Sequence, residues 1–230
     1  MDVIFTYLPI RLKDITEIYL KYSIDNLNKQ NIEPIIYSDI DYFNHTNLKY
    51  KWIRFDVDDM YKVDGLWSYP KLKVLSIIDK PFIHLDNDLI VEDFSKLIKI
   101  LNPKELNICY KHLVNDVSSF IEIFKKYSNK KLNFEYLNNT SIIATEQYQL
   151  VNKSYIEVLD VIDSNYDFFL NRYNTIPPIT LNQQYPNLYF NNIHYLFDEN
   201  PPYGNLNING ICHLAEKQME KIFITDNKLI

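Results

Sequence analysis

Two aspartates separated by one residue, Asp86 and Asp88, are the side chains in this sequence with the clearest potential for chemistry. They follow the apolar run 82–85, which predicts a buried strand ending just before them. In an extended segment the side chains of residues i and i+2 point to the same side, and two carboxylates held together repel unless a cation lies between them. Oxygen ligands of this kind suit Mg²⁺ or Mn²⁺, and such ions in turn hold diphosphates. The pattern therefore predicts a metal site, with a surface turn carrying two solvated aspartates as the alternative.

The segments on either side of the two aspartates favour the metal site over the surface turn. An apolar strand precedes the pair, and the apolar residues 89–91 follow it. Open α/β sheets bind their ligands at the carboxyl ends of the strands, which is where this pair is expected. A metal held there acts as a Lewis acid that stabilises a departing nucleoside diphosphate.

The elements that must position this pair alternate between strands and helices. A strand, a helix that begins at the capping residue Asp14, and a second strand occupy the first 40 residues. This βαβ beginning indicates an α/β fold with a mostly parallel central sheet flanked by helices. The expected strands are 3–8, 34–39, 52–57, 82–85, 106–110, 138–144 and 193–196, and the expected helices are 14–27, 68–79, 94–101, 116–127, 146–162, 181–188 and 213–223.

Composition and charge narrow the class of protein. No internal repeat or linker divides the 230 residues, so a single domain over 1–230 is expected. The net charge of −6 argues against a nucleic-acid partner, because phosphate binding needs a basic footprint. Two cysteines far apart indicate reduced thiols in a cytoplasmic protein. The sequence shows no basic leader and no apolar stretch of the roughly 18–20 residues that a membrane span needs.

Four segments of the chain, in their order, resemble glycosyltransferases of the GT-A type, especially bacterial proteins associated with surface-polysaccharide synthesis. The segments are Trp67 to Lys71, the strand from Pro81 to Asp88, the run from Asn138 to Ile143, and the pair His213-Leu214. Together they span most of the chain, and the second is the most specific. The resemblance implies a GT-A fold, a UDP-linked nucleotide-sugar donor, Mn²⁺ or Mg²⁺ as cofactor, and transfer of the sugar to a glycan or other hydroxyl acceptor.

The resemblance also implies roles for individual residues. The implied metal ligands are Asp86, Asp88 and His213, and His213 would either complete the metal shell or touch the diphosphate. Lys71 would approach the sugar or the diphosphate, because a flexible ammonium pairs readily with phosphate, and Lys71 and Asp88 would be the catalytic residues. The donor's base and ribose would be bordered by Thr6, Tyr7, Ser38 and Asp39, and its ribose or diphosphate by Asn87. Asn139 would help to bind the donor sugar or the acceptor.

Structural roles remain open for several of these residues. Lys71 on a helix could be a solvated lysine, and Trp67 could simply pack beneath the loop before that helix. His84 alternates with Asp86 along the strand, so it either faces the same site or is a core histidine. A lone histidine near a C-terminus, such as His213, is often structural.

Two departures from the family pattern keep other functions open. An acidic residue followed by glutamine is expected in the late helix, where this chain has Asn182-Gln183-Gln184. A catalytic or acceptor-orienting carboxylate would then be missing or would come from Asp64, Asp116 or Glu146. Asn87 stands where a glycine is common between the aspartates. These departures leave a non-catalytic nucleotide-sugar-binding relative as an alternative.

A phosphohydrolase of the haloacid-dehalogenase kind is the other alternative for the two aspartates. In that class one aspartate attacks phosphorus, and the motif normally sits on the first strand, whereas three strands are expected before it here. For the metal site, replacing Asp86 or Asp88 by asparagine is expected to abolish metal-dependent donor binding and to leave the fold intact. Removing one charge from a carboxylate pair rarely destabilises an empty site.

Overall fold

The computed structural model describes residues 1–8, 13–63, 66, 68–113, 136–167, 189–190, 192–197 and 211–213. Within these ranges, seven strands form one sheet in which only one strand runs against the others. In spatial order they are β3 (Lys51–Arg54), β2 (Ile35–Ser38), β1 (Asp2–Thr6), β4 (Phe82–Leu85), β7 (Tyr136–Thr145), β6 (Leu106–Leu113) and β8 (Ile193–Phe197). The reversed strand is β7, which pairs antiparallel with both of its neighbours. The prediction of an α/β fold with a mostly parallel central sheet is confirmed.

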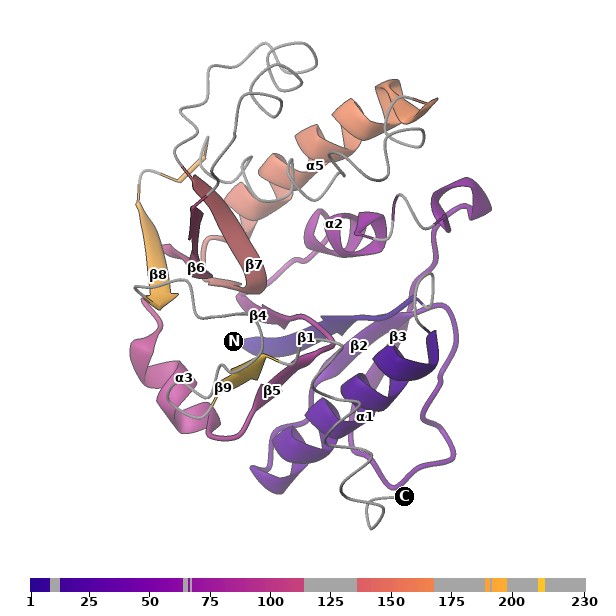
Figure 1. The fold of residues 1–230 in the computed structure, drawn as a ribbon, viewed down its shortest axis with the longest axis vertical. Helices are drawn as coiled ribbons and strands as arrows, with labels where there is room; N and C mark the ends of the chain where they lie inside the picture. Colours follow the sequence, from indigo (N-terminus) through magenta and orange to yellow (C-terminus); the bar gives the residue numbers. More distant parts are fainter. Residues whose placement is uncertain are drawn as a thin grey trace.

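Helices cover both faces of the sheet (Figure 1). On one side lie α2 (Tyr69–Leu75) and α5 (Tyr148–Ser164), and on the other lie α1 (Lys13–Lys29) and α3 (Phe94–Ile100). A short 3₁₀ helix, η1 (Asp59–Tyr61), precedes α2. Because both faces are covered, the central strands carry apolar side chains on both sides, as β1 does with Val3, Ile4 and Phe5.

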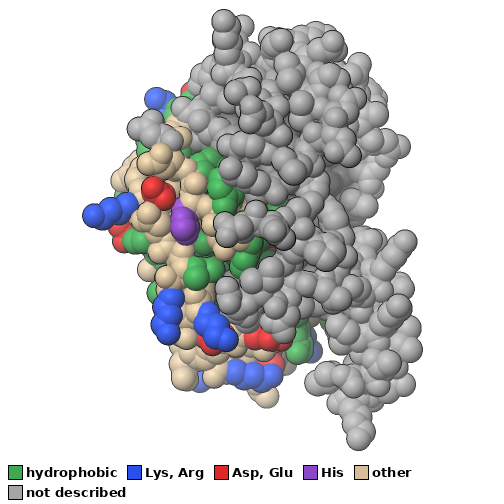
Figure 2. All heavy atoms as spheres, turned by 60° about the vertical axis from the view of Figure 1, so that its left-hand side comes forward, with side chains coloured by type: hydrophobic (Ala, Val, Ile, Leu, Met, Phe, Trp, Pro, Cys, Tyr) green, Lys and Arg blue, Asp and Glu red, His purple; other side chains and the backbone are tan. Residues whose placement is uncertain are grey.

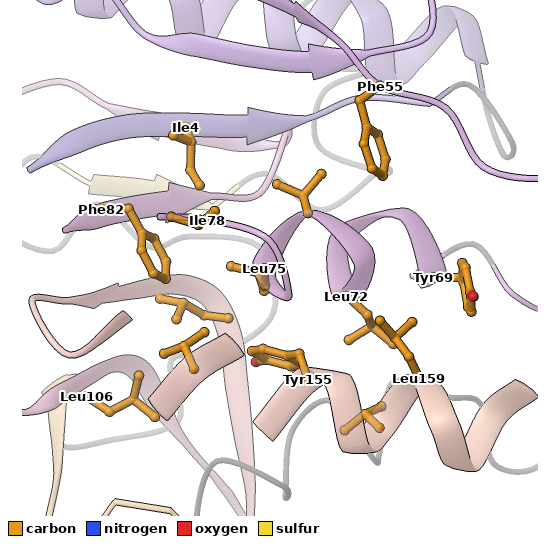
Figure 3. Close-up of a cluster of buried hydrophobic side chains, with 14 of the residues drawn as sticks. Ile4, Phe55, Tyr69, Leu72, Leu75, Ile78, Phe82, Leu106, Tyr155 and Leu159 are labelled. Carbon is orange, nitrogen blue, oxygen red and sulfur yellow. The ribbon is translucent and has the colours of Figure 1, made fainter. Parts of the chain in front are cut away.

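Alternate residues of each central strand enter two separate cores. Ile4 and Phe82 point into the core under α2 and α5, while Phe5 and Ile83 belong to the core under α1 and α3. Figure 3 shows the first core, with side chains from α2, α5 and the sheet meeting at one centre. This packing fixes α2 against the sheet beside β4, which matters for the lysine that α2 carries.

A second, two-stranded sheet lies beside the main one. It pairs β5 (Leu89–Val91) antiparallel with β9 (Ile211–His213), so segments more than a hundred residues apart in sequence are joined. The helix expected to begin at His213 is wrong at that residue, because the backbone of His213 pairs with Leu89 as an extended strand. The helices expected at 116–127 and 181–188 and the rest of the one at 213–223 lie outside the described residues.

No helix within the described part of the chain combines the length and the hydropathy needed to cross a membrane. On the face shown in Figure 2, basic side chains lie beside acidic ones and between hydrophobic ones. The visible described surface is therefore mixed in charge.

The end of α1 is joined to the neighbouring elements by one amide side chain. The Gln30 Nε2 donates to the Val91 carbonyl at 2.8 Å, and its Oε1 accepts from the Phe94 backbone N–H at 2.6 Å. Gln30 thereby connects the end of α1 with β5 and with the start of α3.

Replacing Gln30 by alanine is expected to lower the free energy of unfolding by about 1–2 kcal/mol, because a half-buried carbonyl and N–H lose their partners together. Urea unfolding followed by circular dichroism measures the change. The exposed Asn47 serves as a control, since Asn47→Ala should stay within about 0.5 kcal/mol of the parent. Equal effects of the two substitutions would contradict the assigned role.

Candidate functional site at the carboxyl end of β4

The segment Asp86-Asn87-Asp88 is a turn that joins β4 to β5. The Asp86 carbonyl accepts the Leu89 N–H at 3.0 Å, while the Asp86 N–H donates to the Ser141 carbonyl of β7 at 2.9 Å. The segment is therefore not extended, and the alternation of side chains along a strand is not what brings the two carboxylates together. Both carboxylates nevertheless belong to this turn at the carboxyl end of β4, and the charge of each raises the pKa of the Cys109 thiol.

Lys71 contacts the first of these carboxylates directly. Its ammonium lies 2.5 Å from Oδ1 of Asp86 and donates to the Thr140 carbonyl at 2.6 Å. The Lys71 side chain is only 11% exposed and that of Asp86 is 32% exposed, so the pair is largely shielded from water. The alternative that Lys71 is a solvated lysine on the surface of its helix is therefore wrong.

A β-bulge in β7 supplies both backbone carbonyls of this site. The ladder between β6 and β7 pairs Ile108 with Ile143, but Tyr110 then pairs with Asn139, where a regular ladder would use Ser141. The bulged residues include Thr140 and Ser141, whose carbonyls accept from Lys71 and Asp86. Bulges of this kind are common next to active sites, where they re-aim groups of the strand.

The side chain of Asn139 stabilises the bulge from within. Its Oδ1 accepts from the Ser141 N–H at 3.0 Å and from the Ser141 hydroxyl at 2.6 Å. Asn139 thus stabilises Ser141, the residue whose carbonyl accepts the Asp86 N–H.

A buried hydrogen-bonded chain ties the turn to β1. The Thr6 hydroxyl lies 3.1 Å from Nε2 of His84, and the Thr6 carbonyl accepts from Nδ2 of Asn87 at 3.0 Å. Burial lowers the pKa of His84 well below its usual value, and the positive charge of Lys71 lowers it further, so the ring is neutral. Of the two alternatives for His84, the structure shows the core histidine.

Two side-chain atoms of this network of Thr6, His84 and Asn87 have no hydrogen-bond partner within the described structure. They are Oδ1 of Asn87 and Nδ1 of His84, and both are buried. Because Nδ2 of Asn87 is committed to Thr6, its Oδ1 is fixed as an acceptor beside the two aspartates.

Cys109 and Tyr155 are neighbours of the site that the sequence did not single out. Burial raises the pKa of the Cys109 thiol, the charges of Asp86 and Asp88 raise it further, and that of Lys71 opposes them. The pKa of the Tyr155 hydroxyl is raised by burial and by Asp86. Both groups are therefore neutral, Cys109 in the core under α1 and α3 and Tyr155 in the core under α2 and α5. No local pattern in the sequence signals this, because Cys109 and Tyr155 lie on different elements.

The residues predicted to contact a base lie at the ends of β1 and β2, and most of their side chains have other partners. Tyr7 is fully buried, its ring 4.9 Å from that of Tyr42 in an edge-on contact. The buried Ser38 hydroxyl donates to the Ile40 carbonyl and lies 3.0 Å from Nε1 of Trp52. The ring of Tyr7 and the hydroxyl of Ser38 are therefore used in packing.

Asp39 is half-exposed at the end of β2. Its Oδ1 accepts from the Ile40 N–H at 3.0 Å and from the Tyr42 hydroxyl at 2.9 Å. Burial raises the pKa of Tyr42, and the hydrogen bond to Asp39 raises it further. Two donors thus orient the Asp39 carboxylate on the rim of the sheet.

His213 enters the neighbourhood through its backbone. It pairs with Leu89, the residue that follows Asp88, but only its backbone is described. Trp67, Asp64, Asp116 and Asn182-Gln183-Gln184 lie outside the described residues.

The donor set of the turn fits a hard divalent cation. Asp86 and Asp88 offer carboxylate oxygens, and ions such as Mg²⁺ or Mn²⁺ complete their shells with water and diphosphate oxygens, so two protein ligands suffice. In the residues that the structure describes, no group of three or more His, Cys, Asp or Glu side chains is placed to hold a metal by itself.

A separate open groove of about 540 Å³ runs between α1 and the loop 45–49. Its lining includes Lys21, Asp25 and Lys49 but none of the residues of the β4–β5 turn. Its charged side chains are of both signs and are mostly exposed. The groove is therefore separate from the candidate site at the β4–β5 turn.

Comparison with known proteins identifies similar folds only. No protein-family model and no curated protein sequence matches this chain. Among solved structures, an active-site mutant of LgtC superposes with a TM-score of 0.51 and 13% identity, covering 94% of this chain and 87% of that one. The galactosyltransferase LgtC in complex with donor and acceptor sugar analogs superposes with a TM-score of 0.50 and 13% identity, covering 85% of this chain and 73% of that one. The glycosyltransferase GlyE of Streptococcus pneumoniae TIGR4 superposes with a TM-score of 0.48 and 13% identity, covering 99% of this chain and 52% of that one. The two LgtC superpositions confirm the GT-A fold that the sequence resemblance implied.

Proposed function

We propose that this protein is a metal-dependent glycosyltransferase that moves a sugar from a nucleotide-sugar donor to a hydroxyl of a glycan-type acceptor. The observation that carries the proposal is the turn after β4, where Asp86 and Asp88 share one end of the sheet with the ammonium of Lys71. Carboxylates and a cation in a shielded site match a ligand that consists of a metal and a diphosphate. The fold shared with LgtC, whose structure contains donor and acceptor sugar analogs, supports the same class.

In this proposal Asp86 and Asp88 hold Mn²⁺ or Mg²⁺, with His213 as a further ligand. The ion, when bound, offsets the negative charge that builds on the leaving diphosphate. Lys71 adds a second positive charge beside the same oxygens and acts with Asp88 as a catalytic residue. The Ser141 carbonyl in the bulge of β7 accepts the backbone N–H of Asp86 and keeps Asp86 in place.

The nucleoside is proposed to lie across the ends of β1 and β2. Asp39 is the best-placed side chain there for a base, because a carboxylate oriented by two donors accepts an N–H such as that of uracil or guanine. Thr6, Tyr7 and Ser38 would then border the nucleoside mainly through their backbone. Oδ1 of Asn87 would accept a ribose hydroxyl, and Asn139 would shape the sugar pocket through the bulge.

The phosphohydrolase alternative receives less support from the topology. The two aspartates follow β4, the fourth strand in chain order, and β4 lies between β1 and β7 inside the sheet. The non-catalytic alternative shares the fold and the donor site, so it differs from the proposal only in turnover.

The test is a calorimetric titration of UDP, and separately of GDP, into the protein with Mn²⁺ and with EDTA. We expect UDP to bind with Mn²⁺ and to lose at least about 100-fold in affinity with EDTA, because no divalent ion then offsets the charge of the diphosphate beside Asp86 and Asp88. Slow release of UDP from UDP-sugars under the same conditions separates an enzyme from a binding protein. If neither nucleotide binds under any of these conditions, the proposed function is wrong.

A further inference from the structure

Without a metal, the ammonium of Lys71 already lies where a cation is needed. It contacts Oδ1 of Asp86 at 2.5 Å and also donates to the Thr140 carbonyl. Leu72 and Leu75 on the same helix are fully buried in the core under α2 and α5 and hold α2 beside the site. Asp86 is thus neutralised by the protein itself.

We propose that Lys71 is an internal counter-cation that weakens the binding of a free divalent ion at Asp86 and Asp88 and makes it depend on the diphosphate. This inference rests on the proposed function and adds a regulation of that site. A divalent ion that binds Asp86 comes within a few ångströms of the ammonium, in a place where little water screens their repulsion.

The diphosphate removes this conflict. Its oxygens carry negative charge to both cations, and they offer the ammonium another acceptor when the metal takes its place at Asp86. Metal and nucleotide then favour each other's binding, and the coupling has the same size in both directions. The protein would hold the ion poorly until the donor arrives and release it after the nucleoside diphosphate leaves.

The test measures the affinity for Mn²⁺ alone, by electron paramagnetic resonance of the free ion, in the parent and in Lys71→Met. Methionine keeps much of the length and removes the charge, so Mn²⁺ should bind about tenfold or more tightly in this variant. Lys73→Met is the matched control, because Lys73 lies on the same helix and is exposed. Its affinity for Mn²⁺ should equal that of the parent.

A second measurement repeats the titration with UDP present. In the parent, UDP should tighten Mn²⁺ binding by a large factor, and in Lys71→Met that factor should fall about tenfold or more. Lys71→Gln, which keeps a hydrogen-bond donor without the charge, serves if the methionine variant does not fold.

Each outcome decides between the two proposals. If the parent binds Mn²⁺ with UDP and the neutral variants bind Mn²⁺ alone no more tightly than the parent, the counter-cation role is wrong while the donor site stands. If neither the parent nor the neutral variants bind Mn²⁺, with or without UDP, the metal site itself is wrong and both proposals fall.

Discussion

Replacing Asp88 by asparagine is expected to weaken Mn²⁺-dependent binding of UDP by at least about 100-fold and to reduce sugar transfer at least as much. Asp88 is one of two carboxylates proposed to hold the ion, and a neutral amide oxygen attracts a divalent cation far less strongly. Calorimetry of UDP in saturating Mn²⁺ and a UDP-release assay measure the two effects separately.

A matched control is available for this substitution. Asp59 in η1 is 98% exposed and pairs with Lys62, so Asp59→Asn removes the same charge from outside the β4–β5 turn and should change neither measurement. Circular dichroism of both variants verifies that each is folded. Unchanged UDP binding and turnover in Asp88→Asn would overturn the metal site at the β4–β5 turn.

Replacing Asp86 by asparagine is expected to lower the free energy of unfolding of the metal-free protein by about 2 kcal/mol, in addition to impairing metal binding. The sequence alone led to the expectation that either asparagine variant would keep its stability. The structure adds a reason for Asp86 to differ, because its carboxylate is the partner of a nearly buried ammonium. The estimate is below that for a fully buried pair, since Asp86 is 32% exposed and water can partly replace it.

A double-mutant cycle isolates this interaction. The unfolding free energies of the parent, Asp86→Asn, Lys71→Met and the double variant give a coupling energy, which we expect to be about 1–2 kcal/mol in favour of the pair. Once Lys71 is replaced, the loss of Asp86 should cost little, because no buried ammonium is left unpaired. A coupling energy near zero would show that the contact contributes nothing to stability.

The local sequence was sufficient for most of the secondary structure of the described residues. The run 82–85 carries apolar side chains toward both faces, Phe82 on one side and Ile83 and Leu85 on the other. This pattern favours a central strand covered by helices on each side, and β4 is such a strand. The abrupt change to Asp86-Asn87-Asp88 requires the chain to leave the core there. A strand, a helix and a second strand at the start predict parallel pairing, and β1 and β2 pair in parallel.

Contacts between distant elements could not be predicted in this way. Asp86, at the end of β4, meets Lys71 of α2 and the bulge of β7, while Leu89 of β5 pairs with the backbone of His213 in β9. Each of these contacts depends on how separate elements pack. The expected helix at His213 failed for this reason, because an available strand edge at β5 decided the local conformation. The conformation of a short segment follows its partner more than its own preferences.

The sequence by itself determined which residues carry the charge and at which end of the strand they lie, because polarity along the chain is a local property. Tertiary structure alone decided that Lys71 pairs with Asp86, that His84 bonds Thr6 in the core, and that the ring of Tyr7 is packed against Tyr42. The physical reason is that a side chain's partner is set by the positions of several elements together, and those positions follow from the burial of their apolar faces.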